Sequence, residues 1–508
     1  MNVVTPGRMS PLPSETEGPP APSTRPDRRQ LPWRSLLVVF PLLWAPLLVW
    51  WLAFYPALST PDSVNSWEQI QTGAWTSHHP PPFTALLWLF TRFTSSPWVL
   101  SLAQTVAMAA ALAALAVVLS RRFAAGWWPV WAAFVLVALP WVGPFTLEIW
   151  KDVPSAIALV VLATALIVAT SPTGDRPRPP AWGWTAIVGL SALAAALLRW
   201  NGAGTVWVAG VLVAPALVRG LRMRALLACL AGGAVGIGVL VGLPHVTSVQ
   251  AIPYVESRAT FYTDLAVTAH RRPGHLSAAD RAALEQAAPI ARWSKAGRQC
   301  YWINAVLYRF IDKLPQDKVL RADPPLTASW ERLLKNHPDD IAWARMCRAS
   351  AALPVIPPQG AGYKSFTVTP QQLLTPAATS PLPWLHTIGL RTLDRFTAPP
   401  FLWVFWLPAW WFLLFGAVAA FLWRGLGRRL LVVALSVPVG TIVSYAVTAQ
   451  SNDARYNLPA IMILVPLTAA VIGHRVLLRR GGGGGSSARA GSGGADPAEQ
   501  AVPLESGR

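Results

Sequence analysis

Charged residues are scarce in this sequence, and their scarcity limits the class of protein. Only 13% of the 508 residues are charged, whereas 53% are hydrophobic and the mean hydropathy is +0.40. Ordinary soluble domains carry about 25% charged residues. The composition therefore excludes a typical soluble protein and favours a multispanning membrane protein.

Acidic residues are the rarer of the two charged classes. The chain has 23 Asp and Glu against 42 Lys and Arg, which gives a formal net charge of +19 at pH 7. In a soluble protein this excess would suggest a nucleic-acid partner. Here the arginines stand in short clusters between apolar runs, so we interpret them as topology signals and expect no nucleic-acid partner.

Cysteine is also rare. Three cysteines are too few for a secreted scaffold that is held together by disulfides. Cys229 lies in an apolar run, while Cys300 and Cys347 lie in a polar segment. These two can pair as a disulfide in an oxidising compartment or remain two free buried thiols, because sequence gives no distance between them.

We expect no cleavable signal peptide, and no internal repeat is visible in the sequence. Residues 1–33 are rich in Pro, Ser and Arg, and the first apolar run is long enough to stay in the membrane. We expect 1–33 to be a disordered cytoplasmic N-terminus. The glycine-rich segment 480–508 is expected to be a disordered cytoplasmic tail.

Long apolar runs dominate what is present, and they predict an all-α polytopic membrane protein with about ten transmembrane helices. These runs lie at 35–57, 98–120, 127–146, 153–171, 182–199, 202–218, 225–243, 400–423, 430–449 and 457–478. The run 82–93 is too short to cross and carries Arg92, so we expect a helix lying at the membrane interface.

Basic residues fall in alternate loops of this arrangement and set its orientation. They are Arg28, Arg29, Arg121, Arg122, Arg176, Arg178, Arg219, Arg222, Arg224, Arg428, Arg429, Arg479 and Arg480. The positive-inside rule places these loops in the cytoplasm. The other loops then face outward from the cell membrane, and a site built from them would lie on the outer face.

The predicted organisation has five parts. Between the two termini, residues 34–243 form the first seven spans with a first outer loop at 58–97, and 399–479 form the last three. The segment 244–398 between them has mixed composition and helical stretches such as "SAADRAALEQAAPIARW". We expect it to be an inserted, mainly helical extracytoplasmic domain.

The first outer loop carries the acid of main interest, Asp62 in "TPDSVNSW". A purely structural reading explains it well. Thr60 is a good helix N-cap, Pro61 suits the first helical position, Asp62 complements the helix dipole and Gly73 ends the helix. Taken alone, this acid needs no catalytic role.

Ionisable and polar residues from other outer loops favour a functional reading. They are His78, His79, Glu148, Lys151, Asp152, Arg199, Asn201, Asp453, Arg455 and Tyr456. Each has a structural alternative, such as an interfacial ion pair or a snorkelling arginine. Ionisable groups at span ends are costly without partners, so their convergence on one membrane face indicates a site.

Several motifs together resemble the multispanning C-type glycosyltransferases, which use a polyprenyl-phosphate sugar as donor. The resemblance depends on "TPDS" early in the first outer loop, an interfacial helix, "HHPPPFTALLW" at 78–88 and "ARYNLP" at 454–459. "EIWKDVPSAIAL" at 148–159 and "LRWNG" at 198–202 are more narrowly similar to a bacterial branch of that superfamily. The resemblance covers most of 35–478.

This resemblance implies a transfer of sugar from a polyprenyl phosphate to an extracytoplasmic acceptor such as a cell-wall glycan, lipid or protein. Asp62 would be the general base. Lys151, Arg199, Arg455 and Tyr456 would bind the donor phosphate, because Arg and Lys suit phosphate oxygens. The supporting residues would be His78, His79, Glu148, Asp152 and Asn201.

The sequence departs from the family pattern in one respect, since no second acid follows Asp62 as in a metal-binding D-x-D motif. We therefore expect no cofactor. A divalent metal stays open as an alternative without the support of a D-x-D motif, because His78 and His79 could ligate a metal, bind phosphate or form a rigid turn. The competing class is a transporter or flippase of a lipid-linked or anionic substrate, which usually carries polar groups near mid-membrane and discontinuous spans. A structural or sensory membrane protein would not explain the convergent acids and bases.

Overall fold

The protein is described by a computed structural model, which covers residues 31–482 with gaps. The gaps are residues 95, 171–180, 218, 252–253, 308, 351, 353–379, 397–400, 402–404, 406, 422–427 and 451–452. The two predicted disordered termini lie outside the described residues, apart from 31–33 and 480–482.

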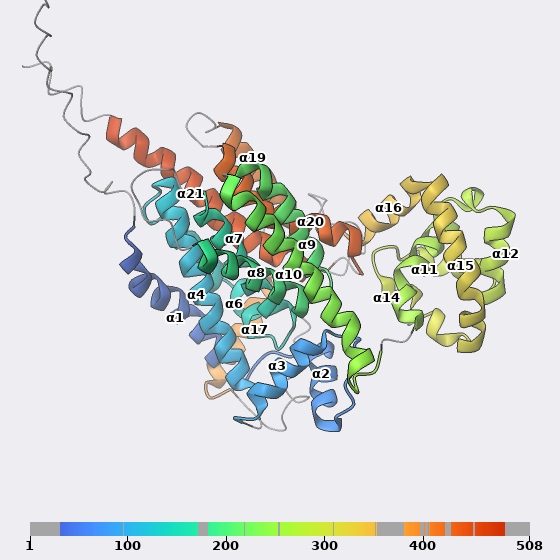
Figure 1. The fold of residues 1–508 in the computed structure, drawn as a ribbon. Coiled ribbons are helices and arrows are strands. Elements are labelled where there is room, and N and C mark those ends of the chain that lie inside the picture. Colours follow the sequence, from blue (N-terminus) through green and yellow to red (C-terminus); the bar gives the residue numbers. More distant parts are fainter. Residues whose placement is uncertain are drawn as a thin grey trace, which may run out of the picture.

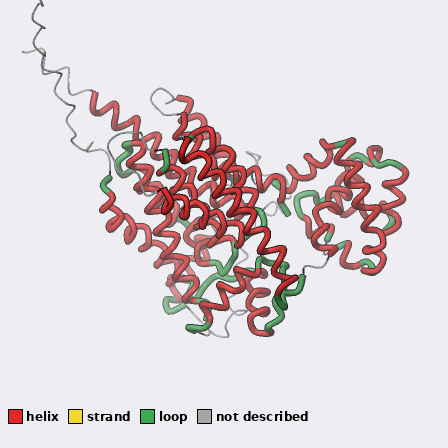
Figure 2. Tube along the Cα trace, in the orientation of Figure 1, coloured by secondary structure: helices red, strands yellow, loops and turns green. Residues whose placement is uncertain are grey.

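Helices make up the ordered structure of the described residues, as predicted (Figure 2). A helical bundle holds most of them, and a smaller group of helices stands beside it (Figure 1). Extended pairing in the described part of the chain consists of two isolated bridges, Leu58 with Glu148 and Thr76 with Gln250. The prediction of an all-α protein is therefore confirmed for these residues.

Five helices are long and apolar enough to cross a membrane. They are α1 (Leu36–Ala53), α4 (Trp98–Phe123), α10 (Arg219–Val246), α20 (Arg428–Thr448) and α21 (Leu458–Gly482). Shorter apolar helices pack among them, namely α5 (Trp128–Ala138), α7 (Asp152–Val168), α8 (Ala181–Leu198), α9 (Gly202–Val213) and α19 (Pro408–Phe421). These lengths and compositions indicate a multi-pass membrane protein.

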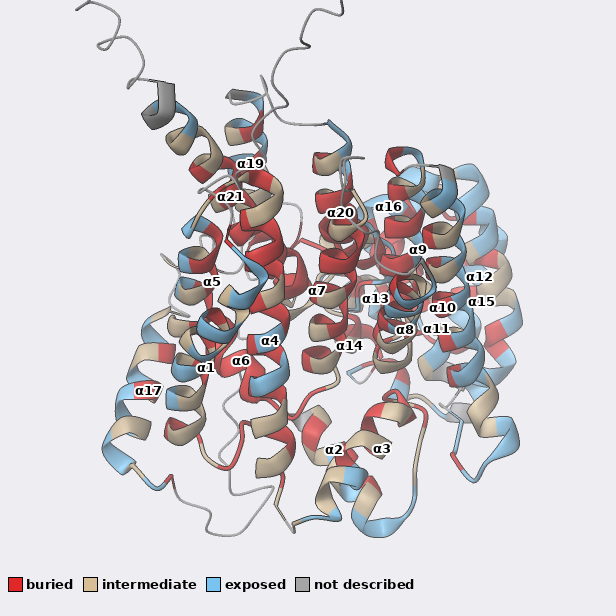
Figure 3. Ribbon diagram, turned by 60° about the vertical axis from the view of Figure 1, so that its left-hand side comes forward, coloured by how far each residue is buried: buried red, intermediate tan, exposed pale blue. Residues whose placement is uncertain are grey.

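Apolar side chains cover much of the outside of the bundle, whereas α7 and most of α4 are buried inside it (Figure 3). Large apolar side chains with at least half of their surface exposed include Leu37, Trp182, Leu190, Val211 and Val447. Exposed apolar surface of this extent suits contact with lipid rather than water. Inside, Gly440 allows α20 to approach α9, because a Cβ there would lie 2.5 Å from the Thr205 carbonyl oxygen.

Two expected spans are interrupted by proline. The run 127–146 forms α5 and the short α6 (Val142–Leu147), with Pro140 at the break. The run 202–218 forms α9 and a 3₁₀ turn at Ala214–Ala216 that contains Pro215. Proline lacks the backbone N–H that a continuous helix needs, so hydrophobicity alone overestimated the length of these helices.

The bundle has two chemically different ends. At one end Arg122 donates to the Val168 carbonyl at 2.5 Å, and Arg224 lies over the Trp182 ring. We call this the arginine end. The opposite end, the site end, carries α2 (Pro61–Thr72) and α3 (Pro81–Thr91), visible at the bottom of Figure 1. With 11 residues, α3 is too short to cross a membrane.

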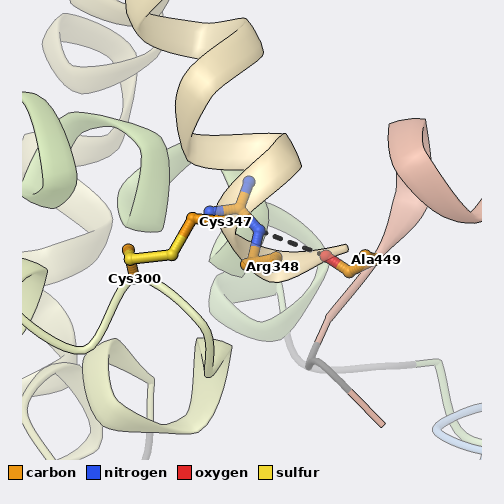
Figure 4. The surroundings of a disulfide bond; sticks show 4 residues. All are labelled: Cys300, Cys347, Arg348 and Ala449. Atoms are coloured by element: carbon orange, nitrogen blue, oxygen red, sulfur yellow. Dashed lines mark hydrogen bonds between the residues drawn. A yellow bond between two sulfur atoms is a disulfide. The ribbon is translucent and has the colours of Figure 1, made fainter. Parts of the chain in front are cut away.

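The separate group of helices, which we call the side lobe, comprises residues 254–350. Its helices are α11 (Tyr254–Arg271), α12 (Ala278–Ala287), α13 (Ile290–Gly297), α14 (Ile303–Val306), α15 (Gln316–Asn336) and α16 (Pro338–Arg348). They enclose a core of their own around residues such as Tyr262 and Trp293. Cys300 and Cys347 were expected to form either a disulfide or two free thiols, and in the structure they form the disulfide (Figure 4).

The predicted domain 244–398 contains more than this lobe. Helix α10 continues to Val246, and α17 (Pro383–Phe396) returns to the bundle. Leu393 of α17 packs in one buried cluster with Phe54, just after α1, and His386 Nδ1 lies 2.9 Å from the Ala53 carbonyl oxygen. The mixed composition of α17 therefore reflects an amphipathic helix against the bundle, not a part of the side lobe.

Candidate functional site

Helix α2 begins with a complete capping box that does not involve Asp62. The Ser63 backbone N–H donates to Thr60 Oγ1 at 3.2 Å, and the Thr60 N–H donates to Ser63 Oγ at 2.9 Å. Ser63 Oγ also donates to the Ile149 carbonyl at 2.6 Å, which fastens α2 to the loop before α7. Gly73, at φ 71°, ends the helix as predicted. The first-turn acid is thus left available for other partners.

The Asp62 carboxylate joins the first loop to the loop at 148–152. Lys151 Nζ donates to Asp62 Oδ2 at 2.6 Å, and the Trp150 indole N–H donates to the same oxygen at 2.9 Å. Arg455 Nη1 lies 3.8 Å away, within range of an ion pair. The Asp62 side chain remains 27% exposed. Three segments far apart in sequence therefore meet at one accessible carboxylate.

Electrostatics keep this carboxylate ionised. Burial by itself raises the pKa of Asp62, but the positive charges of Lys151 and Arg455 outweigh that effect and hold the pKa well below its usual value. At neutral pH the site therefore presents a negative oxygen surrounded by cations. A carboxylate in this state accepts a proton only after a cation has moved away from it.

His79 is the neutral member of the cluster. Burial and the neighbouring Lys151 lower the pKa of His79 to about 2. Lys151 Nζ lies 3.0 Å from His79 Nδ1, so the lysine donates and Nδ1 accepts. The ring proton then sits on Nε2, which faces Asp62 Oδ1 at 3.7 Å, a distance too long for a hydrogen bond. His79 thus holds the lysine and leaves room beside the acid.

Aromatic rings hold the guanidinium group of Arg455. Its Cζ lies 3.7 Å from the Trp150 ring centroid and 5.0 Å from that of Tyr456. Asp453 Oδ2 lies 2.9 Å from Arg455 Nε and forms an ion pair with it. Stacking on a face leaves the edge of a guanidinium free to donate hydrogen bonds in its own plane, which suits phosphate recognition.

A second ion pair lies next to this one. Arg199 Nη1 is 2.6 Å from Asp152 Oδ1, and both side chains are at least nine-tenths buried. Arg199 Cζ lies 4.1 Å from the Tyr456 ring centroid, so both arginines contact the same ring. The predicted phosphate-binding residues Lys151, Arg199, Arg455 and Tyr456 are thus brought together at the site end.

Glu148 is buried beside the cluster without a hydrogen bond to its Oε2 among the described residues. It is 2% exposed, and burial raises its pKa well above the usual value, although Arg455 opposes this effect. Its backbone is fixed by Gln104, whose side-chain amide donates to the Glu148 carbonyl at 2.8 Å. Glu148 can therefore supply a neutral carboxylic acid next to an ionised Asp62.

Two of the predicted supporting residues lie elsewhere. His78 turns toward the side lobe, where its Nδ1 lies 2.5 Å from Glu256 Oε2 of α11. Asn201 takes part through its backbone, because Ser444 Oγ donates to the Asn201 carbonyl at 2.6 Å. The two adjacent histidine rings contact each other edge to face, with centroids 4.6 Å apart. Their partners differ, because His78 lies beside Glu256 and His79 beside Asp62.

The prediction missed two contributors. Trp150 both donates to Asp62 and stacks on Arg455, yet an aromatic residue beside Lys151 reads in sequence as an interface anchor. Glu256 lies in the polar segment and gave no signal of contact with the first loop. A parallel bridge between Thr76 and Gln250 draws that segment alongside and so decides the pairing of His78 with Glu256.

Metal-ligand side chains do not gather around Asp62 in the described part of the chain. The group of three His, Asp or Glu side chains within reach of one ion lies in the side lobe, at His275, His337 and Asp340. Comparison of the chain with protein-family models, with curated proteins and with solved structures finds no match. The site is therefore interpreted from its own geometry.

Proposed function

We propose that this chain is a membrane glycosyltransferase that moves a sugar from a polyprenyl-phosphate donor to an extracytoplasmic acceptor. The supporting observation is the accessible Asp62 carboxylate held between Lys151, Arg455 and neutral His79 at one end of an apolar helical bundle. A lipid-linked substrate places its phosphate at the membrane surface, where this cluster lies in a membrane-embedded bundle.

The chemistry follows from these charges. The acceptor hydroxyl oxygen forms a bond to the sugar C1, the bond from C1 to the phosphate oxygen breaks, and the hydroxyl proton passes to Asp62. Lys151 and Arg455 neutralise the charge that develops on the departing polyprenyl phosphate. A phosphate that draws these cations to itself also weakens their hold on Asp62. Donor binding would then make Asp62 a stronger base when it is needed.

An apolar cavity of about 390 Å³ offers a place for part of the lipid. It lies between α1, α5 and α17, and its lining includes Val49, Trp50, Phe134, Leu385 and Ile388. Trp50 and Leu385 belong to the buried apolar cluster that also contains Leu58 and Leu147, the neighbours of the site loops. A hydrocarbon chain lying there would approach the site from within the membrane.

The orientation we propose places the site end outside the cell and the arginine end in the cytoplasm, in a bacterial cell membrane with about ten crossings. A single cysteine at Glu68, which is exposed on α2, should react with an impermeant reagent added to whole cells. A cysteine at Met223, which is 56% exposed near the arginine end, should react only after lysis. The reverse pattern would overturn the orientation.

One observation favours the alternative of a transporter or flippase. The break between α5 and α6 is a discontinuous helix of the kind that lines substrate paths. The break, at Leu139 to Trp141, carries no ionisable side chain, whereas the ion pairs gather at the helix ends. This position of the charges supports chemistry at the surface over passage of a substrate.

The deciding experiment uses the purified full-length chain in detergent with radiolabelled polyprenyl-phosphate sugars. Wild-type protein should release polyprenyl phosphate when an acceptor extract is present, and Asp62→Asn should not. Glu68→Gln on the exposed face of the same helix is the matched control and should behave as wild type. Lipid movement across proteoliposomes without sugar release would support the transporter instead.

A further inference from the structure

The side lobe contains a cluster of metal-ligating side chains far from the proposed catalytic residues. We propose that His275, His337 and Asp340 bind one divalent transition-metal ion of the zinc class. His275 ends the short 3₁₀ turn Pro273–His275 after α11, and His337 is the single residue between α15 and α16. Asp340 lies in the first turn of α16.

The geometry brings one ligand atom from each residue to within 4.8 Å of the others. His275 Nδ1 lies 2.7 Å from Asp340 Oδ2, and the two imidazole rings stack at 4.0 Å between centroids. Zinc–ligand bonds of about 2.0–2.2 Å in a tetrahedron place ligand atoms about 3.3 Å apart. To share an ion, the ligand atoms need to approach one another by about 1.5 Å or less, and at least one imidazole has to rotate out of the stack, because a bound metal lies in the plane of the ring.

The chemistry of the donor set selects the class of ion. Two imidazole nitrogens and one carboxylate match the three-ligand zinc sites that leave a fourth position for water. Calcium and magnesium prefer sites made wholly of oxygen. The side chain of His275 is 33% exposed, so solvent and an ion can reach the cluster, while Asp340 is 2% exposed and held rigidly.

A hydrogen bond alone explains only part of this arrangement. Asp340 is satisfied by His275 on one oxygen, and Arg272 lies 3.4 Å from the other oxygen while pairing more closely with Asp339 at 2.5 Å. No hydrogen bond of the His337 ring is recorded among the described residues. A metal ion would bind a ring nitrogen of His337. Arg272 would then stay on the outer side of the Asp340 carboxylate.

The consequence for the fold is that α16 would be fastened at both of its ends. Its last turn already carries the disulfide to Cys300 (Figure 4). The same turn carries the buried ion pair of Arg348 with Asp264. A metal at its first turn would tie the helix to the end of α11. Because the ion binds the folded lobe and not the unfolded chain, it would stabilise the lobe.

The test uses the full-length chain purified in detergent without a polyhistidine tag and stripped with a chelator. Titration with Co²⁺ should give about one visible-absorbing site per chain, which Zn²⁺ displaces. Saturating Zn²⁺ should raise the melting temperature of the lobe by several degrees. The variant His337→Ala should weaken Co²⁺ binding at least tenfold, since one of three ligands is lost.

His270→Ala is the matched control, because His270 is exposed on α11 and contacts only Ser294 among the described residues, at 3.4 Å. It should bind Co²⁺ as wild type does. Asp340→Asn provides a second loss of ligand that keeps the side-chain shape. Absence of stoichiometric Co²⁺ binding in the wild type would overturn the proposal. Co²⁺ binding by His337→Ala that equals wild-type binding would also overturn it, because the ion would then bind elsewhere, for example at His78 and His79. The result does not depend on glycosyl transfer.

Discussion

Two carboxylates in different regions of this protein have the same set of partners, namely two cationic side chains and one tryptophan N–H. Asp62 at the site end is held by Lys151, Arg455 and the indole N–H of Trp150. Asp264 in the side lobe is held by two arginines and the indole N–H of Trp330. The two differ in access, since the side chain of Asp62 is 27% exposed and that of Asp264 is fully buried.

The difference shows how burial assigns a role to an ion cluster. Arg345 and Arg348 both contact the Asp264 carboxylate. Arg345 also donates to the Val447 carbonyl, and Arg348 to the Ala449 carbonyl, at the end of α20. That cluster fastens the side lobe to the bundle and has no opening for a ligand. Around Asp62 the cations have an open side, so a phosphate can compete for them.

Asp62→Asn should produce the largest effect on rate. Loss of a positioned base typically lowers turnover by roughly 100-fold to 10,000-fold, whereas loss of a helix-dipole partner costs only about 0.3–1 kcal/mol of stability. We expect sugar transfer to fall into the first range while the protein still folds. Steady-state release of polyprenyl phosphate by the purified variant measures this. Near-normal turnover would reduce Asp62 to a helix-terminal acid.

Asp264→Asn should do the opposite, with a large loss of stability and little direct effect on the site. Removing one partner of a buried ion pair costs about 3–5 kcal/mol because the other charges stay buried. The side lobe should unfold at lower temperature and be cut sooner by protease. Asp317→Asn is the control, since its exposed pair with Arg321 is worth less than about 1 kcal/mol. An Asp264→Asn protein as stable as wild type would break the comparison.

The pH dependence of stability should separate His79 from Asp62. The pKa of His79 is about 2 in the folded protein, below its unfolded value, so its unfolded form gains a proton as pH falls below about 6.5. Stability should therefore decrease by about 2 kcal/mol between pH 6.5 and 5. Asp62, whose pKa is lowered, contributes stability that is lost only below about pH 4.

Melting temperatures of wild type and His79→Gln, measured from pH 7 to pH 5, test this. The variant should show the shallower decline, because it carries no group that must stay neutral in the fold. Equal slopes would mean that His79 titrates in the folded protein as freely as in the unfolded chain.

Thr60→Ala should give the smallest effect and sharpen the distinction between capping and chemistry. It removes the capping side chain of α2, which is typically worth about 1 kcal/mol. Transfer should remain within a few-fold of wild type, because Lys151 and Trp150 still hold Asp62. Turnover lost to the degree expected for Asp62→Asn would show that α2 positions the acid through its cap.

Sequence predicted the helices well because length and hydrophobicity are local properties. Every predicted span overlaps a helix of the described residues, five of these helices are long enough to cross a membrane, and the short run at 82–93 forms the short α3. The number of crossings remains a prediction. The prediction was wrong at two places. A proline breaks the expected span 127–146 into α5 and α6, and the amphipathic α17 packs against the bundle instead of the predicted outer domain. The membrane orientation and the catalytic roles remain predictions.

By itself the sequence determined that the chain forms helices, some of them long and apolar enough to cross a membrane, and that acids and bases occur at helix ends. It also placed Asp62 in a helical first turn, where both a helix-dipole partner and a catalytic residue were open. The tertiary structure alone decided which partner each group meets, because Lys151 and Arg455 reach Asp62 from loops distant in the chain. It also sent His78 and His79 to different sides. Burial and distance, which set the strength of a charge, arise only when the helices pack together.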